Sequence, residues 1–516
     1  MIDLGGAERL FSRACFVYVV QRMIKCGSNV PQLRQAASHG CAEELFFGIG
    51  CENCLVLYLS LSYEDCSVVG GDRCWSAAGR MRVGLCFVPG DVLRVMEKIH
   101  KAGADVWVVG GALRDFLLEI EPKDWDLATS ASTGKIVSLF PGVIPVGIRH
   151  GTVQVRTRTR DIEVTSFEPP GEAGILKDLG RRDFTINSLA LSYPHGVLID
   201  PHRGREDLKA GLIRAVGNPR ARFSEDPLRI VRAARICGIY GFRVDHAALN
   251  AMRELSGKLQ RVSGERIRNE ILKILLAVNV SGAFDLLRKS GALGRLLPGL
   301  DAPVNIATGR GSGVSIFEHT LACIINCPEI IRIRLAALFH KIAASTAEVG
   351  DDGQKMDFRR ESARSAGKTM KMWNMSNRSV HEVSTLVEHQ LPPAAPSWSD
   401  ARIRRFIATV HPELIDDFIA LAEAEVLSGG YVEFGIEEIR QLRARMKIQL
   451  DRISALSVRE LALGGHDIMK ILDLPPGPEV GKVLNHLFDL VQEDPELNTR
   501  ESLSRIVETN YKAAGR

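Results

Sequence analysis

The sequence has few aromatic residues and no run of about 18 or more apolar residues, so a transmembrane helix is not indicated. Aromatic residues make up 6% of the 516-residue chain, whereas 45% of its residues are hydrophobic and 25% are charged, which is typical of a globular protein. Neither sign of charge dominates, because 66 Lys and Arg residues stand against 62 Asp and Glu residues. This weakly basic balance allows a phosphate-rich partner without requiring one.

Cysteine is scarce in most of the chain, since eight of the 11 cysteines lie in the first 86 residues. The pair Cys51-x-x-Cys54 has no second CxxC pair to complete it, so it is a weak sign of a zinc site. Residues 1–80 show neither a signal-peptide pattern nor a sustained hydrophobic period. We expect Met81 to be the biological start and residues 1–80 to be an over-extended reading frame. A family-specific extension is the alternative, and no chemistry is assigned to this segment.

Hydrophobic periodicity divides the rest of the chain into two parts. Strand and helix signals alternate between residues 104 and 200, whereas strand signals vanish after about Ser224 and helical patterns continue nearly to the end. The predicted strands are Val83–Val88, Asp105–Val109, Trp125–Leu127, Gly151–Val155, Asp161–Phe167, Ser188–Leu191 and Val197–Ile199. The predicted helices are Val92–Ala102, Leu113–Leu118, Pro227–Gly238, Glu265–Leu276, Val280–Leu287 and Ser457–Leu472. The sequence therefore predicts an α+β head with a small mixed sheet, followed by an all-helical remainder.

A glycine pair, Gly110-Gly111, ends one predicted strand and opens the next helix. Glycine lets the backbone approach a ligand closely, and Arg114, one turn into the helix, is a planar donor suited to a phosphate oxygen. Taken alone, a glycine turn before a helix is more often purely structural.

Two acidic residues, Asp124 and Asp126, follow the glycine turn after about ten residues. Residues two apart in a strand point to the same face, so these carboxylates stand side by side. Close carboxylates repel each other unless a cation joins them, and hard oxygen ligands favour Mg²⁺, which also bridges phosphates. An isolated Asp-x-Asp is more often a solvated loop, but its place behind the glycine turn favours a site.

With these motifs the sequence resembles the class II tRNA nucleotidyltransferase and bacterial poly(A) polymerase family, within the polymerase-β-like nucleotidyltransferases. Five motifs in the family's order carry the resemblance, which spans about Val83 to Val507. They are Gly110–Asp115 with Asp124–Leu127, His150–Val153 with Glu163–Phe167, Arg181–Ser188, Ser224–Arg229 and Gly264–Glu270. The resemblance implies a nucleotidyltransferase head at 81–222, a helical neck at 223–300, a degenerate HD-type helical body at 301–400 and an RNA-binding tail at 401–516.

The resemblance also implies a role for each motif. Asp124 and Asp126 would hold Mg²⁺ as catalytic ligands, and Glu163, on a neighbouring strand, would be a third acidic group or else a plain surface residue. Contacts to the triphosphate would come from Gly111, Arg114 and Arg182, and contacts to the ribose from Asp183 and Asn187. The nucleotide-selecting helix would present Asp226, Arg229, Arg232 and Arg235. An Asp that accepts and an Arg that donates can read the Watson–Crick edge of C or A, although an Arg stripe is usually a solvated surface.

A second metal site, of the HD phosphohydrolase type, is expected to be broken. His319 and His340 fit ligand positions of such a domain, but Lys341 stands where an Asp belongs and Arg360 where a His belongs. Two cations at ligand positions should abolish metal binding. We therefore expect a structural or RNA-binding body, in which these histidines and His389 are ordinary helix residues.

The function implied by the resemblance is the addition of CMP and AMP, from CTP and ATP, to the 3′ end of tRNA in the cytoplasm, with no membrane partner. A poly(A) polymerase is the nearest alternative, but His150–Val153 and the tail segment Leu463–Met469 are more similar to the tRNA enzymes. Enzymes that add only CC or only A stay open. From other classes, Lys341 and Arg360 argue against a phosphohydrolase, and the intact Asp124 and Asp126 pair argues against a non-catalytic RNA-binding relic.

Overall fold

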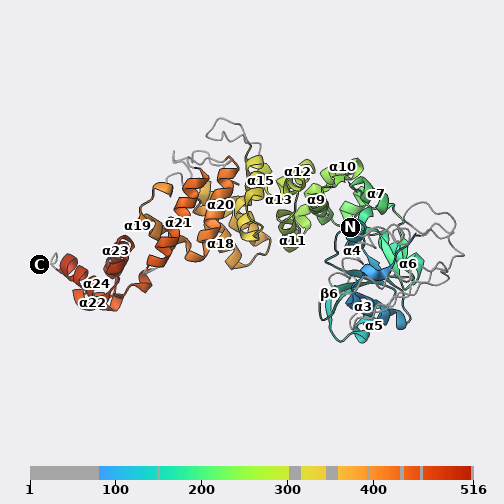
Figure 1. The fold of residues 1–516 in the computed structure, drawn as a ribbon, viewed down its shortest axis with the longest axis horizontal. Helices are drawn as coiled ribbons and strands as arrows, with labels where there is room; N and C mark the ends of the chain where they lie inside the picture. Colours follow the sequence, from blue (N-terminus) through green and yellow to red (C-terminus); the bar gives the residue numbers. More distant parts are fainter. Residues whose placement is uncertain are drawn as a thin grey trace, which may run out of the picture. The chain divides into compact units, whose positions relative to one another are not determined.

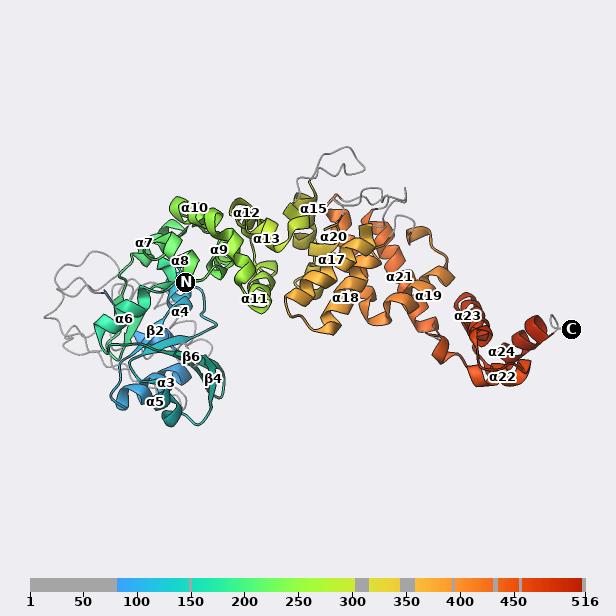
Figure 2. The same ribbon diagram turned by 180° about the vertical axis from the view of Figure 1, so that it is seen from behind.

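The computed structural model describes residues 81–147, 151–301, 315–343, 358–391, 395–429, 435–453 and 457–512. The predictions for residues 1–80 and for His150 lie outside these ranges. The chain forms two compact units: unit 1 extends to Arg229 and includes Phe242–Ala251, and unit 2 comprises Ile230–Gly241 and Met252–Arg516. Unit 1 holds the sheet and unit 2 is helical (Figures 1 and 2). The finer division into head, neck, body and tail stays a prediction.

Unit 1 is built on one eight-stranded sheet with the strand order β1-β8-β7-β2-β3-β6-β5-β4. Its strands are β1 (Met81–Arg82), β2 (Val106–Val109), β3 (Asp126–Thr129), β4 (Val143–Gly147), β5 (Thr152–Arg156), β6 (Asp161–Ser166), β7 (Ala190–Tyr193) and β8 (Val197–Ile199). The sheet is mixed, because β3 and β6 are parallel while the other neighbours are antiparallel. The predicted α+β head is therefore confirmed.

Helices cover both faces of this sheet (Figure 1). The helices of unit 1 are α3 (Gly90–Lys101), α4 (Gly111–Leu117), α5 (Thr133–Leu139), α6 (Glu172–Leu179), α7 (Gly204–Ala210) and α8 (Pro219–Glu225). Ile175 and Leu179 of α6 pack on Val109 and Ala128 of the sheet. The amphipathic helix α3, whose buried residues recur at helical spacing, packs with α5 on the other face.

The predicted strand Val83–Val88 is wrong. Only Met81–Arg82 pairs with the sheet, and Leu85–Phe87 forms a 3-10 turn instead. Leu85 and Phe87 are both buried, and the amide of Val88 donates to the carbonyl of Leu85 at 3.0 Å, which closes the turn. Phe87 stacks on Phe116 with ring centroids 3.7 Å apart, so tertiary packing overrides the apolar run.

In the part of the remaining chain that the structure describes, the secondary structure is helical apart from one short strand. Its helices are α9 (Leu228–Tyr240), α10 (His246–Leu255), α11 (Gly264–Leu275), α12 (Val280–Lys289), α13 (Leu293–Leu296), α14 (Pro298–Asp301), α15 (Ile316–Asn326), α16 (Ile331–Phe339), α17 (Phe358–Met372), α18 (Asn377–Glu388), α19 (Asp400–Val410), α20 (Ile415–Leu427), α21 (Ile436–Arg452), α22 (Gly465–Leu472), α23 (Pro478–Glu493) and α24 (Arg500–Val507). The exception is β10 (Arg243–Val244), which pairs with β9 (Leu212–Ile213), so strands do not end at Ser224 as predicted. Within the described ranges, every helix is too short or too polar to cross a bilayer.

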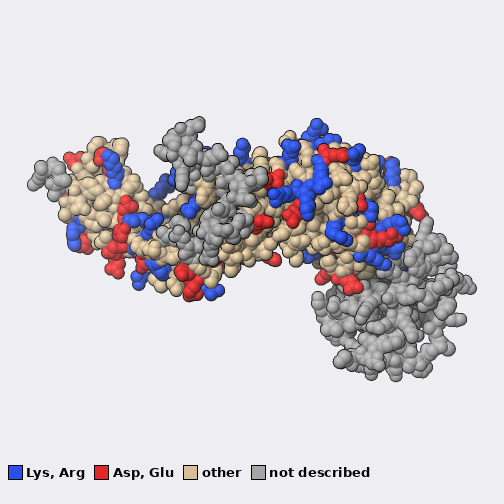
Figure 3. All heavy atoms as spheres, turned by 90° about the horizontal axis from the view of Figure 1, so that it is seen from above, with Lys and Arg blue, Asp and Glu red and all other residues tan. Residues whose placement is uncertain are grey.

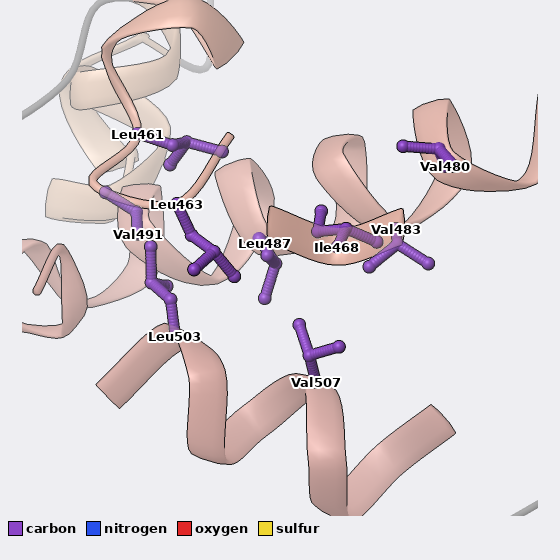
Figure 4. Packing of buried hydrophobic residues seen from close by; sticks show 9 residues of the cluster. All are labelled: Leu461, Leu463, Ile468, Val480, Val483, Leu487, Val491, Leu503 and Val507. Atoms are coloured by element: carbon purple, nitrogen blue, oxygen red, sulfur yellow. The ribbon is translucent and has the colours of Figure 1, made fainter. Parts of the chain in front are cut away.

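Three helices, α22, α23 and α24, enclose a separate apolar cluster near the C-terminus (Figure 4). Its members are Leu461, Leu463, Ile468, Val480, Val483, Leu487, Val491, Leu503 and Val507. The predicted helix Ser457–Leu472 is instead a short 3-10 turn followed by α22, because Leu461 and Leu463 turn into this cluster before the helix begins. Leu487 lies at its centre and is fully buried.

We expect Leu487→Ala to lower the local unfolding free energy of α22–α24 by about 2–5 kcal/mol, because it leaves a cavity among packed side chains. Hydrogen exchange of the amides in α23 and α24, followed by mass spectrometry, measures this change. The matched control is Leu427→Ala, where the leucine is 61% exposed. Equal protection in the two variants would contradict the central place of Leu487.

Candidate active site

The glycine turn at Gly110 brings three parts of unit 1 together. Its φ of 74° and ψ of −135° are strained for any residue with a side chain. A Cβ at this position would lie 2.8 Å from Nη1 of Arg182 and 3.3 Å from Oδ2 of Asp126. The backbone of Gly110 is therefore in close contact with a predicted phosphate-binding arginine and a predicted metal ligand.

The two predicted metal ligands flank a buried tryptophan. Trp125 is 2% exposed, whereas Asp124 is exposed and Asp126 is half-buried. Asp126 is the first residue of β3, and Asp124 lies in the bend just before it. Both aspartates are thus more exposed than the tryptophan between them, and their predicted role as a pair of metal ligands stays a prediction.

Glu163 lies beside Asp126 in the sheet. The two residues are register partners in the parallel pair of β3 and β6, so their side chains leave the same face. Glu163 is exposed, while its neighbours Ile162 and Val164 are fully buried on the other face. Neighbouring strands lie about 4.8 Å apart, so the backbone positions of Asp126 and Glu163 are close to each other. The role of Glu163 as a ligand stays a prediction.

Arg114, Asn187 and Asp183 form a chain of hydrogen bonds inside the head. Nη1 of Arg114 donates to Oδ1 of Asn187 at 2.7 Å, and Nδ2 of Asn187 donates to Oδ1 of Asp183 at 3.0 Å. Asp115 accepts two further bonds from Arg114. All three residues of the chain are buried. The structure thus gives Arg114 a part in holding Asn187 and Asp183, and their contacts to a nucleotide stay predictions, as does that of Gly111.

Arg182 comes from the turn that follows α6. It forms an ion pair with Asp178 at 3.2 Å, one helical turn earlier, and its side chain is 21% exposed. Arg182 sits next to Gly110, so the turn after α6 lies at the same edge of the sheet as Asp126. This edge is where a triphosphate would meet both carboxylates and a guanidinium.

The segment around Asp226 and Arg229 is bound to that same turn. Nη2 of Arg229 donates to the carbonyl of Arg181 at 2.9 Å, and Nη1 of Arg222 donates to the carbonyl of Gly180 at 3.2 Å. Asp226 ends α8, and its Oδ1 accepts the amide of Leu228 at 3.2 Å. Arg229 is therefore bonded to the backbone that carries Arg182, and Arg222 of α8 ties the segment with Asp226 to the same turn.

Arg232 and Arg235 make a different contact, within unit 2. Both arginines form ion pairs with Glu270 of α11, at 3.6 Å and 2.8 Å. Glu270 is 7% exposed, and an unpaired carboxylate so deeply buried would be costly. These arginines therefore have a structural partner in the described helices, and their predicted contact with a nucleotide is not needed to explain them.

The predicted broken second site is in fact a buried polar cluster. His319 and His340 approach with their Nε2 atoms 3.2 Å apart, and Nζ of Lys341 lies 3.0 Å from Nε2 of His319. Burial lowers the pKa of His319 to about 4 and that of His340 to about 3, so both imidazoles are neutral at pH 7. The fourth member is Glu425 of α20, 2.6 Å from Lys341, which the sequence patterns did not single out.

Two residues expected near this cluster do not join it. Arg360 is 76% exposed at its side chain and pairs with Glu388 at 3.7 Å. His389 ends α18 and has its pKa lowered by burial, with Glu388 and Arg360 as its charged neighbours. Arg360 therefore does not replace a ligand within the cluster.

Charged side chains of both signs are interspersed over the described part of the face drawn in Figure 3. Lys and Arg are frequent there, and Asp and Glu lie among them. On the described part of this face, the charges do not form a continuous basic path.

Three family models match the chain in order, and together they define its class. A poly(A) polymerase head domain matches residues 106–214, and an RNA- and SrmB-binding site of polymerase A matches residues 241–303. A model for domain 2 of tRNA nucleotidyltransferases matches residues 358–507. The head with its Gly110 turn is thus that of a nucleotidyltransferase.

The family itself follows from full-length relatives. The chain is 31% identical over 417 residues to a CCA-adding enzyme of Geobacillus sp. strain WCH70, a match that covers 76% of this chain and 90% of the relative. It is 28% identical to a CCA-adding enzyme of Anoxybacillus flavithermus, covering 81% and 97%. The chain belongs to the CCA-adding enzyme family, whose nucleotidyltransferases generally use a divalent metal.

Solved structures share the fold. The CCA-adding enzyme of Bacillus stearothermophilus in complex with CTP superposes with a TM-score of 0.62 at 23% identity, covering 82% of this chain and 98% of that one. The Thermotoga maritima enzyme complexed with tRNA gives a TM-score of 0.50 at 20% identity, covering 82% and 96%.

We expect Gly110→Ala to abolish most nucleotidyl transfer, because its methyl group would displace Arg182 and crowd Asp126. Initial rates and the KM for nucleoside triphosphate measure the effect. Gly103→Ala is the matched control, since Gly103 also has a positive φ, 79°, but its added Cβ would meet nothing within 4 Å. That control should lose about 1–2 kcal/mol of stability and keep its activity. Equal activity in both variants would contradict the close contact at Gly110.

Proposed function

We propose that this chain adds CMP and AMP, from CTP and ATP and without a nucleic-acid template, to the 3′ end of tRNA, so that the CCA end is completed or repaired. Membership of the CCA-adding enzyme family supports this function. The observation that carries it is the meeting of Gly110, Asp126 and Arg182 at one edge of the sheet. At this edge, Asp126 can bind a metal and Arg182 can donate to a phosphate. Gly110 between them has no side chain that would block a substrate.

Mg²⁺ is the metal we propose, with Asp124 and Asp126 as its ligands and Glu163 as a candidate third. The donors fit, because all three are carboxylates at or beside the start of β3, and hard oxygen donors favour Mg²⁺ over softer metals. When bound, such an ion would lower the pKa of a tRNA 3′-hydroxyl and offset charge on the departing pyrophosphate.

The chain's own residues would orient the triphosphate. Arg182 can donate to phosphate oxygens beside Asp126, and its salt bridge with Asp178 holds it in place at the end of α6. The tight turn at Gly110 leaves room for the phosphates to approach the backbone. Positioning of this kind accounts for much of the catalysis of phosphoryl transfer.

Base choice would depend on Asp226 and Arg229. A carboxylate that accepts from an exocyclic amine and a guanidinium that donates to ring acceptors can read the pairing edge of C or A. The hydrogen bonds from Arg229 to Arg181 and from Arg222 to Gly180 support this role, because they tie the selecting segment to the turn that bears Arg182. Base and triphosphate would thus be read from one rigid element.

We also propose that the enzyme acts in the cytoplasm, where tRNA is processed, and that the helical neck, body and tail bind the tRNA. The segments 223–300, 301–400 and 401–516 correspond to these parts. The match of residues 358–507 to a tRNA nucleotidyltransferase domain supports a contribution of the body and tail.

Asp124→Ala and Asp126→Ala should each reduce incorporation about a thousandfold or more, since loss of a metal ligand removes several kcal/mol of transition-state stabilisation. Radiolabelled CMP incorporation measures the rate, and a filter-binding assay measures tRNA affinity, which should stay near wild type.

The matched control for these two variants is Asp161→Ala, which removes an exposed carboxylate of β6 that forms an ion pair with Arg156 at the surface. It should keep near wild-type incorporation. Near wild-type rates in Asp124→Ala or Asp126→Ala would overturn the metal assignment.

Asp226→Ala and Arg229→Ala should impair the choice between C and A by about ten- to a hundredfold, because a bidentate base contact contributes about 1–3 kcal/mol. The ratio of kcat/KM for CTP and ATP, measured on tRNA that ends before CCA and after CC, reports the change. Arg220→Ala, at an exposed arginine of α8, is the control. An unchanged ratio with uniformly slower incorporation would show that the pair only supports the fold.

The product pattern separates the proposed function from its neighbours. Wild-type protein is given tRNAs that end before CCA, after C and after CC, each with Mg²⁺ and one labelled nucleotide at a time. Complete CCA addition gives C on the first two substrates and A on the third. Long A tails would indicate a poly(A) polymerase, and products that stop at CC or need CC would indicate a partial enzyme.

A further inference from the structure

The cluster of His319, His340, Lys341 and Glu425 lies inside unit 2, where it joins three helices. His319 is on α15, His340 and Lys341 follow α16, and Glu425 is on α20. His319, His340 and Lys341 are at most 5% exposed, and Glu425 is 15% exposed at its side chain. A buried ammonium costs several kcal/mol to desolvate unless partners surround it, so this position demands an explanation.

Hydrogen bonds fix which imidazole nitrogens carry lone pairs into the cluster. Nδ1 of His340 lies 2.6 Å from the carbonyl of Ala337 and must donate to it, which leaves Nε2 as an acceptor. Nε2 of His319 accepts from the Lys341 ammonium at 3.0 Å. The two Nε2 lone pairs thus face each other across 3.2 Å. Facing lone pairs require a nearby positive charge, and the Lys341 ammonium supplies it.

The two histidines, together with the carboxylate of Glu425, have the spacing of a metal site. Nε2 of His319, Nε2 of His340 and a carboxylate oxygen of Glu425 lie within 4.8 Å of one another. Two ligands about 2.0–2.1 Å from one tetrahedral ion lie roughly 3.3 Å apart, close to the spacing of the two Nε2 atoms. Two histidines and a glutamate are a ligand set that Zn²⁺ accepts.

We propose that the Lys341 ammonium is the resident cation of this centre, and that His319, His340 and Glu425 form a latent site for a divalent transition metal that the ammonium keeps closed. In the native chain the tethered charge takes the place of an ion: it contacts the imidazole of His319 and the carboxylate of Glu425, and it lies close to the lone pair of His340 that faces His319. It thereby fastens α15 and α20 to the end of α16. Without that charge, Zn²⁺ or Co²⁺ should enter. This inference does not depend on the function of the head.

The test compares metal binding by the full chain before and after Lys341→Ala. Protein stripped with a chelator is dialysed against limiting Co²⁺, and bound metal is measured by mass spectrometry and by visible absorption. We expect Lys341→Ala to bind one more equivalent than wild type, and the triple variant Lys341→Ala, His319→Ala, His340→Ala to lose it. Wild type has the same head and the same cysteines, so metal bound there cancels in the comparison.

Thermal unfolding gives an independent readout. The midpoint of Lys341→Ala should fall below that of wild type in chelator and rise again with Zn²⁺, whereas wild type should not respond at this site. The control Lys371→Ala removes an exposed lysine of α17 and should bind no extra metal. Lys341→Asp adds a carboxylate that can act as a fourth ligand. This variant should also bind one more equivalent of metal than wild type.

Three outcomes would overturn the proposal. One is the absence of an extra equivalent in both Lys341→Ala and Lys341→Asp. Another is extra Co²⁺ with the strong absorption of thiolate ligands, which would place the metal at the cysteines. The third is that both variants are insoluble with and without Zn²⁺, because an ion in this site should replace the stabilisation that the ammonium gave.

Discussion

The pairing of β3 with β2 on one side and with β6 on the other decides where the chemistry of the head lies. Asp126 is opposite Val109 in the antiparallel pair and opposite Glu163 in the parallel pair. A slip of one residue would exchange the faces of Asp126 and Leu127 and place the carboxylate among the buried side chains on the face of Leu127, so apolar packing fixes the register. With this register, Asp126 lies next to the turn at Gly110. The site therefore takes its geometry from the apolar packing on both faces of the sheet.

Unit 2 depends on buried charges of another kind. Arg334 donates to the carbonyls of Leu275, Cys327 and Pro328 and so joins the ends of α11 and α15. Arg404 does the same for the last turn of α23, where the helix dipole favours a cation. Each charge has several partners, which keeps the cost of burial tolerable. Such charges define which helix ends meet, whereas the free energy of folding comes mainly from apolar clusters such as that around Leu487.

Local sequence patterns predicted most secondary-structure elements of the head correctly, because each of its motifs spans only a few residues. The strand before Gly110, the helix after it and the strand that begins at Asp126 each depend on residues within a few positions of one another. The patterns failed where distant residues decide the outcome. Phe87 leaves the predicted strand Val83–Val88 to stack on Phe116, and Glu425 reaches His319 from about a hundred residues away. The hydrophobic periodicity of a sequence cannot reveal contacts between residues that are far apart in the chain. The sequence did identify Lys341 as incompatible with a metal, but could not show that it fills the place of one.

The proposed metal site in the head and the His319–Lys341 cluster in unit 2 both place hydrogen-bond or metal acceptors close together, but they differ in the cation that stabilises them. Each gathers acceptors that repel one another, and each needs a positive charge between them. In the head as we propose it, the carboxylates are accessible, and the charge on the substrate changes as pyrophosphate departs, so an exchangeable ion suits a site that must open and close its coordination. At the cluster of His319, His340, Lys341 and Glu425 the proposed role is structural, with no reaction to change the charge, and the two imidazoles are buried. There a covalently tethered ammonium suffices, since it cannot be lost to a chelator and needs no pathway to solvent. The kind of cation at each centre thus depends on whether the acceptors are exposed to solvent and on whether a reaction takes place there, and not on the type of ligand alone.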